Sequence, residues 1–335
     1  MGSCCATTDT VVTPAKGTEA AIVAAVQLAE EEVRCYCGAC KVKVSGPPTM
    51  QVFCNCDDCR KWGGGCAQAA KLYPADKVKV TGDLLSLPYK EGSGSWRKSC
   101  ATCGGAVVDD KSSTPFNMIM VPAGLFDSPF QPSMHIQYEW KIFSHGDDVP
   151  KYKVLPKAMG APEEELVDDS VAPNPRMKAD HCHDDHHHHH HDEVNTVSCY
   201  CGACRLTVAG EPAMQICCHC DDCRRWGGAI FQAAKLYPAD KVTMKGKFLS
   251  KDKEHRQGMS SWRQCCATCG GVAYDDKSKT PFKMIMIPAG LFDAPFTPEM
   301  HINYGMKVYS VKDGLPKYKA LPKAMGAPEE EIVPE

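Results

Sequence analysis

The sequence predicts a mainly β protein made of two tandem domains, each stabilised by zinc. Three observations predict this class. The chain repeats itself over most of its length, short runs of alternating apolar and polar residues lie between glycines and prolines, and closely spaced cysteines follow the same pattern in both copies. A short helix is expected only near the N-terminus.

The internal repeat divides the chain into two domains. The segment QAAKLYPADKV occurs at 68–78 and 232–242, and LPKAMGAPEEE occurs at 155–165 and 321–331, so the offset grows from 164 to 166 residues. Each copy has about 130 residues, the size of a globular domain. We expect an N-terminal extension over 1–32, a first domain over 33–165, a linker over 166–196 and a second domain over 197–331.

The N-terminal extension contains the one predicted helix. Residues 19–33, EAAIVAAVQLAEEEV, have an amphipathic pattern and are too few and too acidic to span a membrane. Gly2 followed by Cys4 and Cys5 resembles a myristoylated and palmitoylated terminus, although that pattern asks for Ser or Thr where this chain has Ala6. Membrane attachment through acyl groups and a plain disordered terminus are both open. The start has no secretory pattern, so we expect a cytoplasmic protein with reduced thiols.

Short strands are predicted inside each domain. KVKVSG and KVKVTG in the first copy, and RLTVAG and KVTMKG in the second, alternate polar and apolar residues before a glycine. NMIMVPAGLF and KMIMIPAGLF are apolar for most of their length. Strands this short form small, open sheets that need added stabilisation.

The linker carries a histidine-rich tract. HCHDDHHHHHHDE at 181–193 has eight histidines and Cys182, and its surroundings are rich in proline and charge. We expect a flexible linker whose side chains bind extra zinc, nickel or copper weakly. A low-complexity spacer or an expression tag is the alternative.

The charge balance argues against a nucleic-acid partner. The formal net charge is −3, and Lys and Arg are interleaved with Asp and Glu, so no basic surface is expected. The hydrophobic content of 43% and charged content of 24% are ordinary for a soluble globular protein.

The cysteines form a three-part pattern that occurs twice. Short CxC and CxxC spacings let two thiolates from one tight turn bind a single tetrahedral metal. Zinc suits such thiolates, and an iron–sulfur cluster is the alternative. The pattern comprises Cys35, Cys37, Cys54, Cys56, Cys59, Cys100 and Cys103 in the first copy, and Cys199, Cys201, Cys218, Cys220, Cys223, Cys266 and Cys269 in the second.

Seven thiolates per copy do not fill two closed zinc sites. A CxC pair with the distant CxxC pair makes one four-cysteine site, which would be structural. The remaining CxCxxC supplies three ligands, and three protein ligands with an open fourth position are typical of catalytic zinc. Cys40 and Cys204 add an eighth thiol to each copy. If they complete the second site, both sites are closed and the domain is a scaffold.

Together these motifs resemble a known family. CYCGAC at 35–40, CNCDDCRK at 54–61 and CATCGG at 100–105, with CYCGAC, CHCDDCRR and CATCGG in the second copy, are similar to the glutathione-dependent formaldehyde-activating enzymes, which also include centromere protein V. The resemblance implies Mss-four-like domains of small coiled sheets, each with two zinc ions. By resemblance, the structural zinc is held by Cys35, Cys37, Cys100 and Cys103 in the first copy and by Cys199, Cys201, Cys266 and Cys269 in the second. The catalytic zinc is held by Cys54, Cys56 and Cys59, and by Cys218, Cys220 and Cys223.

The resemblance also implies a reaction. Members join glutathione to formaldehyde, giving S-(hydroxymethyl)glutathione, so the implied activity is that of a carbon–sulfur lyase on adducts of formaldehyde or a similar small electrophile. Glutathione carries two carboxylates, and Arg60, Arg97, Arg224 and Arg263 are candidates to bind them. Alternatively these arginines are solvated or pair with neighbouring aspartates. The alternative functions are a non-catalytic zinc scaffold that binds other proteins, and metal buffering.

Two further residue pairs recur beside these motifs. Trp62 and Trp226 follow the CxCxxC segments and either form a pocket wall or pack in the core. His135 and His301 recur in PSMHIQY and PEMHINY, as a general base or as a buried core histidine.

Overall fold

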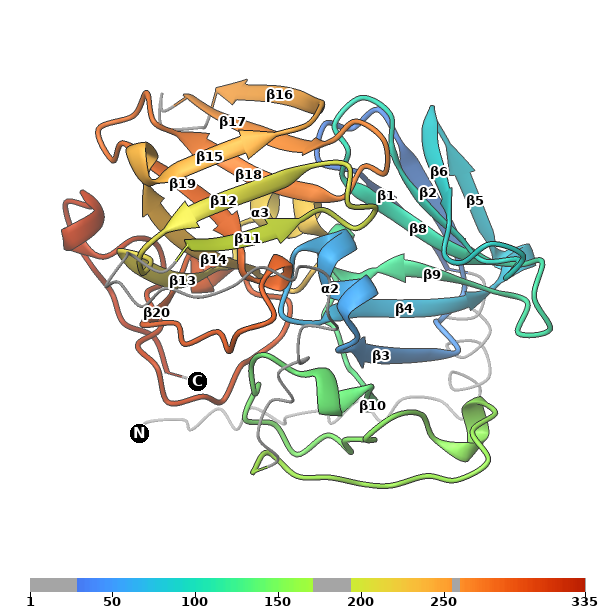
Figure 1. Cartoon of the computed structure of the whole chain (residues 1–335). Coiled ribbons are helices and arrows are strands. Elements are labelled where there is room, and N and C mark those ends of the chain that lie inside the picture. The colour runs from blue at the N-terminus through green and yellow to red at the C-terminus, as the bar shows by residue number, and fades with distance from the viewer. Residues whose placement is uncertain (1–28, 171–193, 255–259, 335) are drawn as a thin grey trace, which may run out of the picture.

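The computed structural model describes residues 29–170, 194–254 and 260–334, which form two similar, sheet-rich halves (Figure 1). We call residues 29–170 the first half and the remaining described residues the second half. The predicted mainly β class is confirmed. The strands of the first half are β1 (Glu30–Arg34), β2 (Lys41–Ser45), β3 (Met50–Cys54), β4 (Gln68–Pro74), β5 (Val78–Thr81), β6 (Leu84–Pro88), β7 (Trp96–Cys100), β8 (Ala106–Lys111), β9 (Met118–Pro122) and β10 (Met134–Ile136).

The second half repeats these elements in the same order. Its strands are β11 (Val194–Ser198), β12 (Arg205–Ala209), β13 (Met214–Cys218), β14 (Gln232–Pro238), β15 (Val242–Lys245), β16 (Phe248–Glu254), β17 (Ser260–Cys266), β18 (Val272–Lys277), β19 (Met284–Pro288) and β20 (Met300–Ile302).

Helices are few and short in both halves. Two α-helices occur in the part of the chain that the structure describes, and each begins one residue after a CxC motif: α2 (Asp57–Gly63) and α3 (Asp221–Gly227). The 3-10 helices are η1 (Ala75–Lys77), η2 (Ala123–Leu125), η3 (Tyr138–Trp140) and η4 (Lys157–Met159), and in the second half η5 (Ala239–Lys241), η6 (Ala289–Leu291), η7 (Tyr304–Met306) and η8 (Lys323–Met325).

Each half contains a three-stranded and a seven-stranded sheet. In the first half the orders are β1-β2-β5 and β10-β3-β4-β9-β8-β7-β6, and the second half has the corresponding orders. The strands pair antiparallel, except that β10 runs parallel to β3 and β20 runs parallel to β13. Strand β9 is buried along its whole length, as its continuous apolar sequence MIMVP predicts. The seven-stranded sheet of each half therefore carries the CxCxxC and CxxC motifs, and the three-stranded sheet carries the remaining CxC motif.

The strand β1 corrects one expectation. Residues 30–33, predicted as the end of a helix and mostly assigned to the extension, belong to a strand that pairs with β2. Alternate burial places Val33 opposite the buried Val42, and Glu32 forms an ion pair with Lys41 at 2.9 Å. Sheet pairing thus overrides the helical preference of a glutamate-rich segment. The remainder of the predicted helix lies outside the described residues.

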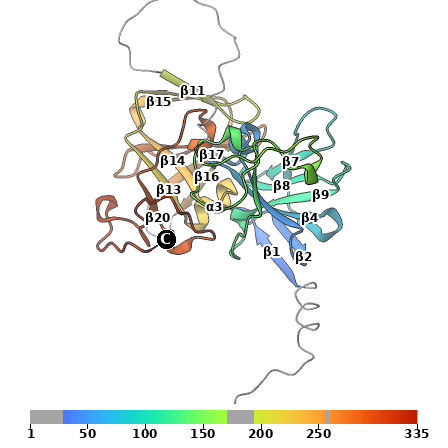
Figure 2. The ribbon, with the colours of Figure 1, turned by 90° about the horizontal axis from the view of Figure 1, so that it is seen from below.

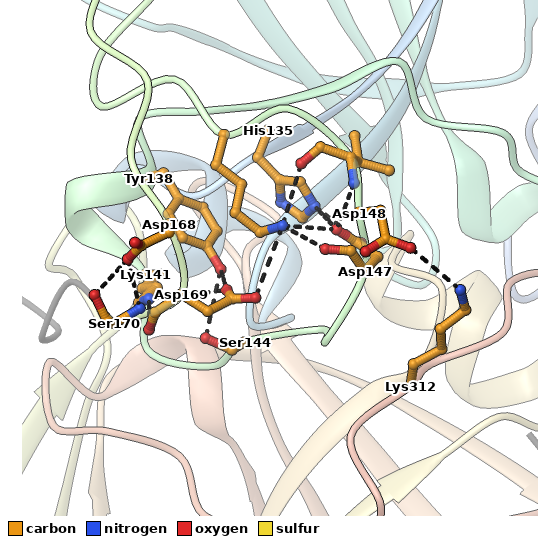
Figure 3. A network of polar contacts seen from close by, with 12 residues as sticks. His135, Tyr138, Lys141, Ser144, Asp147, Asp148, Asp168, Asp169, Ser170 and Lys312 are labelled. Carbon is orange, nitrogen blue, oxygen red and sulfur yellow. Dashed lines mark hydrogen bonds and ion pairs between the residues drawn. The ribbon is translucent and has the colours of Figure 1, made fainter.

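The end of the first half extends into the predicted linker. Residue Val167 donates its backbone N–H to the carbonyl of Lys151 at 2.9 Å, and the Lys141 ammonium donates to the carbonyl of Asp169 at 2.8 Å. Tyr138 donates its hydroxyl to the carboxylate of Asp169 (Figure 3). The first half therefore continues to Asp169. The histidine-rich tract, and Gly2, Cys4 and Cys5 with their predicted acylation, lie outside the described residues.

The two halves pack against each other through reciprocal contacts. Gly124 donates its N–H to the carbonyl of Gly228 at 3.0 Å, and the equivalent Gly290 donates to Gly64 at 3.1 Å. Helix α2 thereby contacts η6, and α3 contacts η2. Both helices lie where the two halves meet in Figure 1, and Figure 2 shows the two halves side by side from below. Reciprocal contacts of equivalent residues are typical of a two-fold dimer. Here the two partners belong to one chain.

A hydrophobic core continues across this interface. One cluster of buried side chains combines Phe53 and Phe143 of the first half with Phe231 and Phe296 of the second. The rings of Phe143 and Phe231 lie edge to face with centroids 6.0 Å apart. Since this apolar surface is buried only when the halves are together, burying it stabilises their association.

No helix among the described residues is long and apolar enough to cross a membrane.

Candidate metal centres

Each half brings four cysteines together from two separate turns. In the first half, the turn between β1 and β2 carries Cys35 and Cys37, and the turn between β7 and β8 carries Cys100 and Cys103. Their sulfur atoms all lie within 4.8 Å of one another. The Sγ atom of Cys37 is 3.7 Å from those of Cys35 and Cys100. A tetrahedral ion with metal–sulfur bonds of about 2.3 Å places its sulfurs about 3.8 Å apart, so the donor set fits zinc.

The second half repeats this four-cysteine group. The Sγ atom of Cys201 lies 3.7 Å from that of Cys199 and 3.8 Å from that of Cys266, and Cys269 completes the group. We call the two sets the four-cysteine groups. Because each joins two turns that are far apart in sequence, a bound metal cross-links the small sheets.

The CATCGG turns need glycine because they touch each other. Gly104 has a φ of +71°, and a Cβ there would lie 2.2 Å from the Cβ of Cys265 in the other half. Gly270 has a φ of +69° and meets Ser99 in the same way. A side chain at either glycine would collide and would also strain the backbone. The repeat of this motif therefore reflects the interface as well as the metal group.

A second group in each half has three cysteines. Cys54 ends β3, Cys56 precedes α2 and Cys59 lies in that helix; their sulfurs lie within 4.8 Å of one another. The Sγ atoms of Cys54 and Cys56 are 3.5 Å apart. In the second half Cys218, Cys220 and Cys223 are arranged in the same way, with 3.6 Å between the first two. We call these the three-cysteine groups.

The eighth thiol of each half does not close the three-cysteine group. Cys40 lies beside the four-cysteine group: its backbone N–H donates to Cys35 Sγ at 3.3 Å, and its thiol donates to the carbonyl of Asp83 at 3.2 Å. Cys204 repeats both contacts with Cys199 and Lys247. Within the described part of the chain, each three-cysteine group therefore has three thiols and no fourth metal-binding side chain. Among the described residues, four groups could hold metal ions.

One thiol of each three-cysteine group has a lowered pKa. Hydrogen bonds from Cys54 and Cys56 hold the pKa of Cys59 well below its usual range, and the charges of Arg97 and Lys111 contribute. In the second half, hydrogen bonds from Cys218 and Cys223 lower the pKa of Cys220, helped by Arg263. Both groups thus favour at least one thiolate before any metal is considered, as a metal-binding or nucleophilic site requires.

Arg97 and Arg263 lie at the three-cysteine groups. The Nη2 atom of Arg97 donates to Cys59 Sγ at 3.4 Å, and that of Arg263 donates to Cys223 Sγ at 3.3 Å. Both side chains are fully buried. The sequence predicted these arginines as partners of glutathione carboxylates. In the structure they hydrogen-bond to cysteine sulfurs of the protein itself. A role toward glutathione stays a prediction.

Arg60 and Arg224 have a different place, in the interface between the halves. Arg60 donates to the carbonyls of Gly290 and Phe292, at 3.3 and 2.9 Å, and pairs with Asp57 at 2.5 Å. Arg224 donates to the carbonyls of Gly124 and Phe126 in the same way and pairs with Asp221 at 2.8 Å. The pairing with aspartates was the alternative considered from the sequence. Because these guanidinium groups already have partners across the interface, they join the halves rather than face a ligand.

The recurring histidines and tryptophans are buried. His135 Nε2 lies 3.0 Å from a carboxylate oxygen of Asp147, and His301 Nε2 lies 2.7 Å from Asp313 (Figure 3 shows the first pair). The same figure shows Lys312 of the second half reaching Asp148, 3.5 Å away. Trp62 donates to Ser99 Oγ at 3.0 Å and Trp226 to Cys265 Sγ at 3.1 Å. These contacts fit packing and positioning roles.

An open cavity of about 290 Å³ lies against the three-cysteine group of the second half. Cys218, Cys220 and Cys223 form part of its wall, and Arg263 lies in the same wall. Most of the remaining lining is apolar and comes from β14, β19, β20, η7, η8 and the segment before η8: Leu236, Met286, Ile302, Met306, Leu321 and Met325. A cavity of this size accommodates a small organic molecule.

Sequence reasoning missed the polar residues of this cavity, which are Asn303, Lys277, Thr280 and the aspartates Asp221, Asp222 and Asp275. Asn303 donates its side-chain amide to Cys218 Sγ at 3.4 Å. Lys277 lies in the lining and forms an ion pair with Asp275 at 3.1 Å. The signal for Asn303 was its position directly after the repeated MHI motif, two residues after His301. Lys277 recurs as Lys111 after two aspartates in each copy, a pattern typical also of a solvated strand end.

Comparison with known proteins agrees with the cysteine arrangement. A family model described as "Glutathione-dependent formaldehyde-activating enzyme" matches residues 30–140 and 194–306, which together exceed half of the chain. No curated protein matches. Among solved structures, a crystal structure of a Rhodobacter sphaeroides protein is 16% identical, with a TM-score of 0.23, over 40% of this chain and 96% of that one. On the family match, this chain belongs to the glutathione-dependent formaldehyde-activating enzyme family, with one matching region in each half.

Proposed function

We propose that the protein is a zinc-dependent carbon–sulfur lyase that forms and breaks glutathione adducts of formaldehyde or a similar small electrophile. The observation that carries this proposal is the three-cysteine group of the second half, which adjoins the open cavity and has no fourth metal-binding side chain among the described residues. Three protein ligands facing a cavity are what a catalytic zinc requires.

In this proposal zinc is the metal at all four groups. All the donors are thiols, the ligands that zinc prefers, and zinc has no redox chemistry that would oxidise them. The four-cysteine groups stabilise each half. When bound at a three-cysteine group, zinc supplies a thiolate at neutral pH by lowering the pKa of the incoming thiol.

The chain's own residues then hold the reactants. The sulfur of glutathione attacks the carbonyl carbon, a carbon–sulfur bond forms, and the carbonyl oxygen takes a proton to become a hydroxyl. In the reverse direction the carbon–sulfur bond breaks and the proton returns to sulfur. Lys277 lies at the cavity as a cation for a glutathione carboxylate, which would share it with Asp275, its ion-pair partner at 3.1 Å. The apolar side chains of the lining reduce contact with water, which protects the adduct.

The scaffold alternative is less well supported. It required a closed second zinc site, and Cys40 was the thiol that would have closed it. The contacts of Cys40 are to Cys35 and Asp83, beside the four-cysteine group. The resemblance to centromere protein V is the reason to consider a protein-binding function. No surface feature described above favours that function.

The test is exchange NMR between glutathione and its hydroxymethyl adduct, with the zinc-loaded protein. We expect exchange faster than the protein-free background, and we expect the double variant Cys54→Ser and Cys218→Ser to lose it. The zinc content should fall from about four ions per chain to about two. Cys66→Ala is the control, since this thiol is buried outside both kinds of group. Parent protein that exchanges no faster than background contradicts the proposal.

A further inference from the structure

The arginine beside each three-cysteine group is held in place from the other half of the molecule. Arg97 of the first half and Arg263 of the second are each only 1% exposed. Each lies in a strand, β7 or β17, and uses Nη1 to donate to a carbonyl of the helix in its own half, that of Asp58 or Asp222, and Nη2 to donate to the sulfur of Cys59 or Cys223. Edge-on hydrogen bonds of this kind leave the faces of the planar guanidinium free to stack.

Aromatic rings cover those faces, and one ring in each case comes from the opposite half. The guanidinium carbon of Arg97 lies 4.5 Å from the ring centre of Tyr200, and that of Arg263 lies 4.6 Å from the ring centre of Tyr36. The rings of the arginines' own halves are farther away: Trp62 and Trp226 at 5.3 and 5.2 Å, and for Arg97 also Tyr89 at 5.1 Å. In a buried place such cation–π contacts are at their strongest.

The two tyrosines are the middle residues of the CYC motifs. Tyr36 stands between Cys35 and Cys37, and Tyr200 between Cys199 and Cys201, so each is fixed by a four-cysteine group. Tyr200 is further held by its hydroxyl, which donates to the carbonyl of Tyr89 in the first half at 3.0 Å. The same contact occurs twice, from the second half to Arg97 and from the first half to Arg263. A chance orientation of one side chain does not explain both.

We propose that Tyr36 and Tyr200 are positioning residues that act across the interface. Each holds the arginine that hydrogen-bonds to a three-cysteine group of the opposite half, so each three-cysteine site is complete only when the other half is folded and packed against it. The four-cysteine turn of one half thereby becomes part of the wall behind the reactive site of the other. For its catalytic meaning this inference rests on the proposed function; the physical contact does not.

The inference has a consequence that a purely local role would not have. With zinc bound, Cys223 would be a thiolate whether or not Arg263 contacts it, so the hydrogen bond from Arg263 lowers the nucleophilicity of this sulfur, and the buried guanidinium restricts access to it. Without the ring of Tyr36, the guanidinium loses its stacked orientation and that hydrogen bond weakens. Cys223 should then react faster with an alkylating reagent, whereas Cys59, whose arginine stacks on Tyr200, should be unaffected.

The test is alkylation of the zinc-loaded full chain with iodoacetamide, with the rate at each cysteine measured by peptide mass spectrometry. We expect Tyr36→Leu to raise the rate at Cys223 about fivefold or more and to leave Cys59 at its parent rate. Tyr200→Leu should do the reverse. The two thiols of one molecule serve as controls for each other. Tyr36→Phe and Tyr200→Phe keep the ring and should restore most of the parent behaviour.

A second variant separates positioning from general loosening. Arg263→Lys removes the planar group on which Tyr36 acts, so Tyr36→Leu should add little at Cys223 in that background. The inference is overturned if Tyr36→Leu raises Cys59 as much as Cys223, if it changes neither, or if its effect on Cys223 persists fully in Arg263→Lys. Alkylation needs no turnover. If the protein shows no adduct exchange but Tyr36→Leu and Tyr200→Leu still act on the opposite half as expected, the proposed function is contradicted and this inference is not.

Discussion

The two halves of the molecule share their metal groups and interface but differ at the cavity. The four-cysteine groups, the interface glycines and the buried arginines recur at equivalent positions. Around the three-cysteine groups the first half has Gln137 and Trp140 where the second has Asn303 and Met306, both of which line the cavity. Replacing a flexible methionine by a tryptophan adds bulk at that position. The comparison teaches that the shared residues stabilise the fold, whereas the differing ones bear on which half is suited to a ligand.

The largest effect is expected at the four-cysteine groups. Cys100→Ser and Cys266→Ser each remove one of four ligands from a group that cross-links two distant turns, and structural zinc contributes about 10 kcal/mol or more to folding in small domains. We expect each variant to lose the cooperative thermal unfolding of the whole chain, because the halves share a hydrophobic core. If either half kept its full unfolding temperature, the shared core would not couple them.

A smaller effect should separate the two interface arginines. Arg60→Met removes the ion pair of a buried carboxylate, because the Asp57 side chain is only 6% exposed. The partner of Arg224, Asp221, is 32% exposed and can be hydrated. We expect Arg60→Met to lower the free energy of unfolding by about 3–5 kcal/mol and Arg224→Met by about half as much, in urea denaturation. Equal losses would mean that the exposed fraction of the aspartate is irrelevant.

Exchanging the residues that differ at the cavity tests the comparison directly. Met306→Trp should fill part of the second-half cavity and lower kcat/KM for adduct exchange about tenfold or more. Trp140→Met, the matched variant in the first half, should leave the rate unchanged or raise it. Exchange NMR of both variants provides the check. A larger loss from Trp140→Met than from Met306→Trp would place the activity in the first half and contradict this prediction.

A further difference between the halves predicts a pH effect. His145 is buried in the shared core, and the equivalent residue of the second half is Val311. Burial lowers the pKa of His145 to about 3. The unfolded chain therefore binds a proton that the folded chain excludes, and this lowers stability as the pH falls from about 6.5 toward 3.

The variant His145→Val should remove that contribution. Between pH 7.5 and 5.5, the free energy of unfolding of the parent should fall about 1 kcal/mol more than that of His145→Val. Urea denaturation at the two pH values measures the difference, with zinc content monitored throughout. If the free energies of unfolding of parent and variant fell equally with pH, His145 would take up a proton as readily in the folded as in the unfolded chain. That result would contradict the lowered pKa.

The sequence predicted the parts of the site that depend on local spacing. The CxC and CxxC motifs identified all fourteen thiols of the four groups, since ligands two or three residues apart must lie together. The sequence could not show whether Cys40 completes the three-cysteine group. Its thiol donates to the carbonyl of Asp83, a residue distant in sequence that only the folded chain brings close. The interface role of Arg60 and Arg224 was missed for a similar reason. Their burial arises only when the halves pack, and sequence spacing carries no record of that contact.

The fold followed the same rule. Short strands were predicted from alternation, but residues 30–33 were assigned to a helix because their glutamates suit one locally. Their pairing with β2 depends on ion pairs and on the buried Val33, which only the folded sheet supplies.

The account's central claim, that the three-cysteine group beside the cavity carries out the chemistry, is tested most directly by separating the two halves in one experiment. Adduct exchange should be measured by NMR for Cys54→Ser and Cys218→Ser side by side, with zinc content determined for each. The account predicts that Cys218→Ser abolishes exchange, whereas Cys54→Ser keeps most of it. Full exchange in Cys218→Ser, with the zinc of that group lost, would contradict the claim.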